Sequence, residues 1–176
     1  MSNDVVDVLV DACARGVRTV LIGGRSGSGK TTLADRLGER TGHRVIHLDD
    51  FYPGWGGLAQ GSLMVARDVL DPIAPGYTRW DWCRDRPGEW VALDPEETFI
   101  VEGVGALTPA NLRAALRRGP CFTVRMELAT ETRRNRALSR DPGFADWWRY
   151  WEEQEISHAA DPKNVLSTVD LVVDGG

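Results

Sequence analysis

Short apolar runs alternate with amphipathic stretches along the whole chain. The apolar runs that predict strands are residues 19–22, 44–48, 98–101, 121–128 and 169–173. Apolar residues recur at helical spacing over residues 4–15, 32–37, 63–70, 109–118, 131–140 and 146–159. Strands that alternate with helices in this way predict an α/β fold with a doubly wound parallel sheet and helices on both of its faces.

The length of the chain limits the number of domains, and its charge limits the partners it can bind. A chain of 176 residues can form one α/β domain with a sizeable core, and it is too short for two of ordinary size, so we expect residues 1–176 to be a single domain. The net charge of −5 provides no overall attraction to nucleic acid or to an anionic membrane. No apolar run approaches the roughly 18 residues of a membrane-spanning helix, and the chain starts with an acidic segment. We therefore expect a cytoplasmic monomer or homodimer.

A glycine-rich turn directly follows the first apolar run. Residues 24–31 read Gly-Arg-Ser-Gly-Ser-Gly-Lys-Thr and fit the pattern G-x-x-x-x-G-K-[ST]. The glycines allow backbone conformations in which successive N–H groups point at a polyphosphate, and the helix that follows directs its N-terminal dipole at the same anion. Lys30 would reach the β- and γ-phosphate oxygens, and the hydroxyl of Thr31 would bind Mg²⁺. The residues predicted to bind a nucleoside triphosphate are Gly24, Ser26, Gly27, Ser28, Gly29, Lys30, Thr31 and Thr32.

Acidic residues end two other apolar runs. Asp49 and Asp50 follow the second run, and Glu102 follows the third. Ligands of an open parallel sheet bind beyond the carboxyl ends of its strands, so these acids are expected at the same edge as the loop. We expect Thr31, Asp49 and Glu102 to hold Mg²⁺ and Asp49 to act as the base, with a turn cap or a buried structural carboxylate as the alternatives. His47 is interpreted as a strand residue that packs at the sheet.

Arginines at positions 133, 136 and 140 share one face of a predicted helix. Like charges three or four residues apart destabilise a helix unless an anion compensates them, and a transferring phosphate would be such an anion. We therefore expect a lid-like helix at about residues 130–145, in which Arg136 and Arg140 take part in catalysis. A solvated face that neighbouring acids neutralise is the alternative.

An insertion of about residues 53–93 separates the second and third strands and includes a predicted two-stranded ribbon at 77–82 and 89–93. Flat apolar walls are supplied by Phe51, Tyr52, Trp55, Trp80 and Trp82. Together with the polar residues nearby, this mix suits a small ring-bearing polar molecule. The residues predicted to bind such an acceptor are Asp49, Tyr52, Trp80, Asp81, Arg84 and Arg86. For Trp90, Trp147, Trp148 and Trp151 a small satellite core is the favoured interpretation.

The order and spacing of these motifs resemble the uridine kinase and phosphoribulokinase group of P-loop kinases. The motifs that match are the loop at 24–31, Asp49-Asp50-Phe51-Tyr52, Val101-Glu102-Gly103 and the Arg-rich helix that ends in Arg140-Asp141. The resemblance covers about residues 18–141. It implies a P-loop NTPase fold with a five-stranded parallel core, ATP or another nucleoside triphosphate as donor together with Mg²⁺, and a small hydroxyl compound as acceptor.

The resemblance also implies roles for single residues. It assigns Asp49 to the acceptor hydroxyl and the metal, Tyr52 to the acceptor site, Glu102 to the end of the third strand, and Arg136 and Arg140 to a lid that closes on the phosphates. The chain departs from uridine kinases where these carry Tyr-Asp-Tyr followed by a histidine and an arginine. Here the sequence Trp-Asp-Trp at residues 80–82 is followed by no histidine. The resemblance therefore does not imply that uridine or cytidine is the acceptor.

The function predicted from the sequence is ATP-dependent, Mg²⁺-assisted phosphoryl transfer to a hydroxyl group of a small molecule. A nucleoside monophosphate kinase is the close alternative. Its ionised acceptor needs arginines more than a base, and Arg67, Arg79, Arg84 and Arg86 keep this interpretation open. A nucleotide-binding regulatory module without turnover is the alternative from another class.

Overall fold

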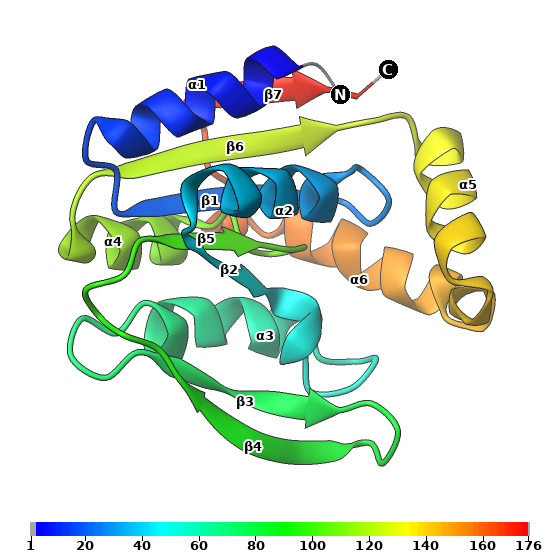
Figure 1. The fold of residues 1–176 in the computed structure, drawn as a ribbon. Coiled ribbons are helices and arrows are strands. Elements are labelled where there is room, and N and C mark those ends of the chain that lie inside the picture. Colours follow the sequence, from blue (N-terminus) through cyan, green and yellow to red (C-terminus); the bar gives the residue numbers. More distant parts are fainter. Residues whose placement is uncertain (1–2, 176) are drawn as a thin grey trace.

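A five-stranded parallel sheet forms the centre of the computed structural model, which describes residues 3–175 (Figure 1). The strands are β1 (Thr19–Gly24), β2 (Arg44–His47), β5 (Phe99–Glu102), β6 (Cys121–Glu127) and β7 (Leu171–Asp174), in the order β2-β5-β1-β6-β7. All four neighbouring pairs are parallel. The predicted α/β fold with a doubly wound five-stranded sheet is confirmed. The strand order changes direction at β1, which is where such sheets bind ligands.

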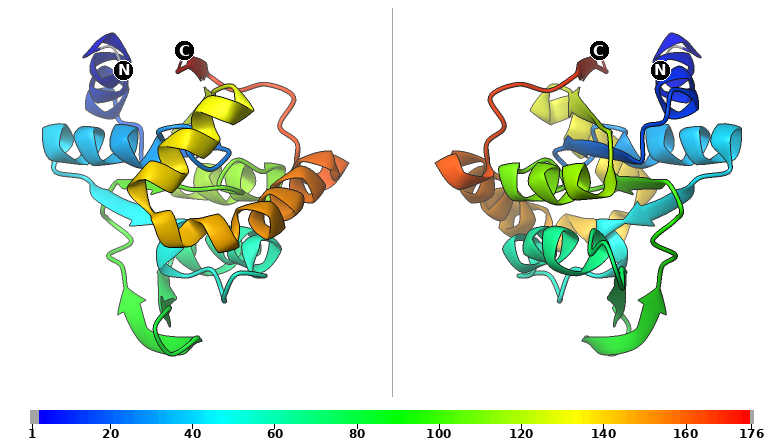
Figure 2. Two further views of the ribbon diagram at one scale, coloured as in Figure 1. Left: turned by 90° about the vertical axis from the view of Figure 1, so that its right-hand side faces the viewer. Right: turned by 90° about the vertical axis from the view of Figure 1, so that its left-hand side faces the viewer.

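Both faces of the sheet are covered by helices because successive residues of a strand point to opposite sides. Val20 and Ile22 of β1 are fully buried against α1 (Asn3–Ala14) and α2 (Lys30–Thr41). Leu21 faces the other way, into the core formed with α3 (Leu58–Met64), α4 (Pro109–Arg118) and α6 (Trp148–Ala160) (Figure 2). Burial of such a side chain contributes roughly 1.5–3 kcal/mol, so the helices on both faces stabilise the sheet. None of the helices within residues 3–175 is long and apolar enough to cross a bilayer.

Helix α5 (Thr130–Arg140) lies across the end of the sheet at which the strands finish (Figure 2). It follows β6 and leads through the 3₁₀ turn Pro142–Asp146 into α6. This is the segment predicted at about 130–145 as a lid. Its position places α5 at the sheet edge where ligands of open parallel sheets bind.

The insertion between β2 and β5 contains α3, a π-helical turn at Val65–Val69 and the antiparallel ribbon of β3 (Gly76–Asp81) and β4 (Arg86–Ala92). The ribbon register shifts between Thr78 and Trp80. Such an irregularity changes which side chains face the protein, because side chains alternate along a regular strand.

Candidate functional site

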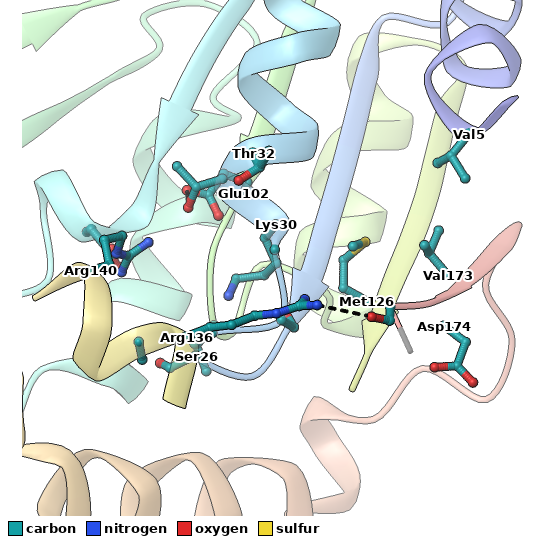
Figure 3. A pocket seen from close by; sticks show the side chains of 18 residues that line it. Val5, Ser26, Lys30, Thr32, Glu102, Met126, Arg136, Arg140, Val173 and Asp174 are labelled. Atoms are coloured by element: carbon teal, nitrogen blue, oxygen red, sulfur yellow. Dashed lines mark hydrogen bonds between the residues drawn. The ribbon is translucent and has the colours of Figure 1, made fainter. Parts of the chain in front are cut away.

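The carboxyl ends of the central strands open into a pocket of about 660 Å³ (Figure 3). The lining includes the glycine-rich loop, two predicted acids and two arginines of α5, and its residues are Val5, Ser26, Gly27, Ser28, Gly29, Lys30, Thr31, Thr32, Asp49, Glu102, Val104, Met126, Arg136, Ala137, Arg140, Val173, Asp174 and Gly175. The side chains predicted for the triphosphate, the metal, the base and the lid therefore meet at one rim of the sheet. We call this space the loop pocket.

The loop has the backbone shape of an anion cradle. Gly27 and Gly29 have φ angles of +78° and +96°, in the left-handed region that favours glycine. A Cβ atom on Gly27 would collide with the carbonyl group of Arg133. The hydroxyl of Ser28 is buried and has no hydrogen-bond partner within the described structure. Because α2 starts at Lys30, its N-terminal dipole points into the same space, and the loop fits a polyphosphate.

Three elements meet at one carboxylate oxygen beside the loop. Thr31 Oγ1 donates to Glu102 Oε1 at 3.1 Å, and His47 Nδ1 lies 2.8 Å from the same oxygen. Burial opposes the ionisation of Glu102, but the hydrogen bond from His47 and the charge of Lys30 outweigh it and lower the pKa of the carboxyl group. The bond to Glu102 in turn raises the pKa of His47 above its usual 6.5. Both shifts favour the ionic form of the pair.

The position of His47 follows from the strand register. His47 lies opposite Glu102 in the β2–β5 pair, and its other ring nitrogen, Nε2, is 3.5 Å from Asp35 Oδ1 on α2. The sequence predicted only a packing role for His47. The structure adds a second role, in which the imidazole fixes the orientation of Glu102.

Asp49 lies in the short 3₁₀ turn Leu48–Asp50, immediately after β2. Asp49 is exposed to solvent at the pocket, while the many protein atoms around its carboxylate reduce its hydration. This loss of hydration and the nearby charge of Glu102 raise the pKa of Asp49 above its usual 3.8, against the opposing charges of Lys30 and Arg140. A carboxylate whose pKa is raised at the edge of a ligand pocket is suited to accept a proton.

The arginines of α5 divide into two groups. Arg136 and Arg140 line the loop pocket, and Arg136 Nη2 donates to the carbonyl of Gly175 at 3.4 Å (Figure 3). Arg133, which the sequence places on the same helix face, is instead buried and donates to the carbonyls of Ser26 and Leu128 at 3.0 and 3.1 Å. Arg133 therefore supports the loop from behind and does not face a ligand in the loop pocket.

A buried carboxylate on α6 completes this support. Glu155 Oε1 accepts from the backbone N–H of Ser26 at 2.7 Å, and Oε2 pairs with Arg25 at 2.9 Å. Arg133 Nη1 lies 3.8 Å from the same carboxylate. Neither Glu155 nor this network was predicted, because no local motif links a residue of α6 to a loop more than a hundred positions earlier.

A second pocket of about 350 Å³ adjoins the loop pocket, and we call it the aromatic pocket. It is lined by Ser26, Asp49, Tyr52, Trp55, Trp82, Arg140, Asp141, Phe144 and Trp151. Ser26, Asp49 and Arg140 line both pockets, so the two spaces meet at these residues. A molecule in the aromatic pocket would have one end beside Asp49.

Several residues predicted to bind the acceptor lie outside the two pockets. Asp81 Oδ1 accepts from the backbone N–H groups of Cys83 and Arg84, and Asp81 Oδ2 pairs with Arg84 Nη1 at 3.1 Å. The ribbon residues Trp80 and Arg86 line neither pocket, whereas Tyr52 lines the aromatic pocket.

Two further sequence predictions differ in detail from the structure. Gly24 borders a cavity on the other side of the loop, next to β6 and α6, and not the loop pocket. Trp148 and Trp151 are buried, as predicted for a satellite core, and Trp151 also forms a wall of the aromatic pocket. The prediction is wrong for Trp90 and Trp147, which are 54% and 41% exposed.

The donor set near Thr31 fits a magnesium ion. Within residues 3–175 no three His, Cys, Asp or Glu side chains are grouped so that they could hold a metal alone. The hydroxyl of Thr31 and the carboxylate of Glu102 are oxygen donors, and Mg²⁺ is typically bound by one or two protein oxygens, phosphate oxygens and water. Asp49 lines the same pocket and is a further oxygen donor.

Comparison with known proteins identifies the fold. No protein-family model and no curated protein matches the chain. A solved structure described as a possible uridine kinase from Bacillus stearothermophilus is 20% identical over 98% of each chain, with a TM-score of 0.59. A gluconokinase from Sinorhizobium meliloti 1021 is 15% identical, with 90% of this chain and 82% of that chain covered and a TM-score of 0.52. The similarity to P-loop kinases that the motifs predicted is confirmed at the level of the architecture, and the chain has the P-loop kinase fold.

Proposed function

We propose that this chain is a kinase that transfers a phosphoryl group from ATP to a hydroxyl group of a small molecule with the help of Mg²⁺. One observation carries the proposal. The phosphate loop, Asp49 and Glu102 line a single pocket, and Thr31 Oγ1 is 3.1 Å from Glu102 Oε1. A triphosphate, a metal and an acceptor would therefore share one site.

Each group of residues would have its own role toward the bound nucleotide. The N–H groups of the loop and the ammonium group of Lys30 bind the polyphosphate. Thr31 and Glu102 would hold Mg²⁺, which would supply positive charge to the polyphosphate. His47 keeps the Glu102 carboxylate ionised and oriented.

Asp49 orients the acceptor hydroxyl and takes its proton. As the acceptor oxygen bonds to the γ-phosphorus, the bond from this phosphorus to the β,γ-bridging oxygen breaks and ADP leaves. Arg136 and Arg140 stabilise the negative charge on the transferring group. The raised pKa of Asp49 supports its role as the proton acceptor.

A direct test uses the purified chain with ATP and Mg²⁺. ADP formation is measured with a panel of nucleosides, sugars, amino alcohols and aryl alcohols, and ATP binding is measured separately. The proposal predicts ADP formation that depends on one class of acceptor, and loss of ATP binding in Lys30→Ala but not in the exposed control Lys163→Ala. Tight ATP binding with ADP formation at background across the whole panel would contradict it and favour a regulatory module.

A further inference from the structure

The rings that form the walls of the aromatic pocket carry few polar atoms, and those of Tyr52 and Trp82 are already engaged. Trp55 lies at the centre, with ring centroids 5.1 Å from Trp82 and 5.6 Å from Phe144. The hydroxyl of Tyr52 donates to the carbonyl of Val104 at 2.7 Å, and the indole N–H of Trp82 donates to the carbonyl of Asp49 at 2.9 Å. These walls therefore offer a ligand mainly ring faces and edges.

The polar side chains of the pocket lie mostly at its reacting end. Ser26, Asp49 and Arg140 are shared with the loop pocket, where the transferring phosphate would lie. The remaining one, Asp141, accepts a hydrogen bond from the backbone N–H of Gly143 at 3.0 Å. The body of a bound molecule thus meets few groups able to pair with polar atoms, and burial of an unpaired polar group is unfavourable.

The charges in this pocket do not favour an anionic acceptor. Its lining carries two carboxylates, Asp49 and Asp141, and one guanidinium, Arg140, which also faces the transferring phosphate. A second anionic group would find no further cation among the lining residues, and it would be repelled by the carboxylates.

Three of the four arginines that kept a monophosphate acceptor open form ion pairs elsewhere, and the fourth, Arg86, lines neither pocket. Arg67 pairs with Asp68 at 2.6 Å, Arg79 with Glu89 at 3.3 Å and Arg84 with Asp81 at 3.1 Å. None of these three arginines lines the aromatic pocket or the loop pocket. A nucleoside monophosphate would therefore lack the cations that its phosphate requires.

We infer that the acceptor is an unphosphorylated alcohol with a flat aromatic or apolar body, held by ring packing in the aromatic pocket with its hydroxyl directed to Asp49. The inference rests on the proposed kinase function for the role of the hydroxyl. It adds the chemical class of the acceptor. The pocket volume of about 350 Å³ lies near the lower end for ligand sites and suits a small molecule.

The test compares three probes by ligand-observed NMR on the full chain with a non-hydrolysable ATP analogue and Mg²⁺. The probes are 2-phenylethanol, 4-(2-hydroxyethyl)benzoate, which adds a carboxylate at the far end, and uridine. We expect 2-phenylethanol to bind saturably with a Kd below about 10 mM, because a ligand this small makes few contacts. The Kd of each of the other two probes should be at least roughly tenfold higher. Absence of saturable binding of 2-phenylethanol, or equal or tighter binding of the benzoate or of uridine, overturns the inference.

Variants locate the probe in the molecule. Trp82→Ala and Trp55→Ala should weaken 2-phenylethanol binding at least about fivefold, because each loses one ring wall. Trp90→Ala on the ribbon, whose side chain is exposed and lines neither pocket, should leave binding unchanged. Trp82 is itself 39% exposed, so the Trp82 variant retains its fold even if the Trp55 variant does not. Binding that is unaffected in a folded Trp82→Ala variant contradicts the inference.

The two proposals fail in different ways. If 2-phenylethanol binds as expected but no alcohol of the panel supports ADP formation, the pocket's preference for an aromatic or apolar molecule stands and the kinase function falls. If ADP forms only with phosphorylated or other anionic acceptors, the kinase function stands and the acceptor class falls.

Discussion

The backbone N–H of Ser26 donates to Glu155 Oε1 at 2.7 Å, although 129 positions separate the two residues. The carbonyl of Ser26 accepts from Arg133 Nη1 at 3.0 Å. Both backbone groups of one loop residue are therefore held, one by α6 and the other by α5. Since these buried contacts stand behind the loop, they determine how its other N–H groups are presented to a phosphate.

Removal of the Glu155 carboxylate should destabilise the protein and weaken nucleotide binding. Glu155→Ala removes the buried carboxylate that lies 3.8 Å from the buried guanidinium of Arg133, so we expect the free energy of unfolding to fall by about 3–5 kcal/mol. Glu155→Gln keeps an oxygen that can accept from the backbone N–H of Ser26, so this variant should lose less stability and less nucleotide affinity than Glu155→Ala. Urea unfolding and ATP titrations measure both effects. The control is Glu153→Ala on the same helix, whose exposed pair with Arg149 is worth little; equal stability of the Glu155 and Glu153 variants would refute this account.

Replacement of His47 should weaken the metal site without abolishing the fold. His47→Gln removes the imidazole that contacts Glu102, and loss of such supporting contacts typically costs roughly 10–100-fold in metal affinity. We expect the Mn²⁺ affinity of the nucleotide-bound protein, measured by electron paramagnetic resonance, to fall by about tenfold or more. His43→Gln, four residues earlier and outside the loop pocket, is the matched control. Equal Mn²⁺ affinity in the two variants would show that His47 only packs.

The lid arginines should affect turnover more than ATP binding. Arg136→Ala and Arg140→Ala are each expected to lower kcat at least about tenfold, or ~1.4 kcal/mol of transition-state stabilisation. Arg134→Ala, on the same helix but outside the loop pocket, should have little effect. Steady-state kinetics separates kcat from KM. Values of kcat within about twofold of the unsubstituted chain in both pocket variants would identify these arginines as surface charges.

Protonation of His158 should reduce stability at mildly acidic pH. Burial lowers the pKa of His158 below its usual 6.5, so the unfolded chain binds this proton more readily than the folded one. The stability that the neutral imidazole contributes is present above pH about 6.5 and is lost as the pH falls from there towards the folded-state pKa. Urea unfolding at pH 7.5 and 5.5 should show a smaller loss of stability at the lower pH for His158→Gln than for the unsubstituted chain. An identical loss in both would show that His158 does not contribute to the pH dependence of stability.

The fold and the phosphate loop were predictable because their signals are local. The alternation of apolar runs with amphipathic stretches specified the sheet and the helices. The loop motif stands directly between a strand and a helix, and Asp49 and Glu102 each follow an apolar run. Parallel strands bring their carboxyl ends to one edge, so the convergence of these residues followed without knowledge of the strand order.

The unpredicted parts depend on pairings that no local pattern specifies. The interaction of His47 with Glu102 requires β2 to lie beside β5 in one register. The choice of Trp82 over Trp80 as a pocket wall depends on the path of the ribbon, whose register shifts at Thr78 and Trp80. Glu155 reaches the loop only because α6 packs against it. Each is a tertiary relationship between distant segments.

The central claim is that Asp49 acts on an acceptor hydroxyl beside a bound triphosphate, and single-turnover phosphoryl transfer with Asp49→Asn tests it most directly. Asn keeps the shape but cannot take the proton, so we predict a fall in the transfer rate of roughly 10²–10⁴-fold with ATP affinity little changed. Asp50→Asn, the adjacent carboxylate that does not line the loop pocket, should transfer at close to the normal rate. Transfer by Asp49→Asn as fast as by Asp50→Asn would contradict the account.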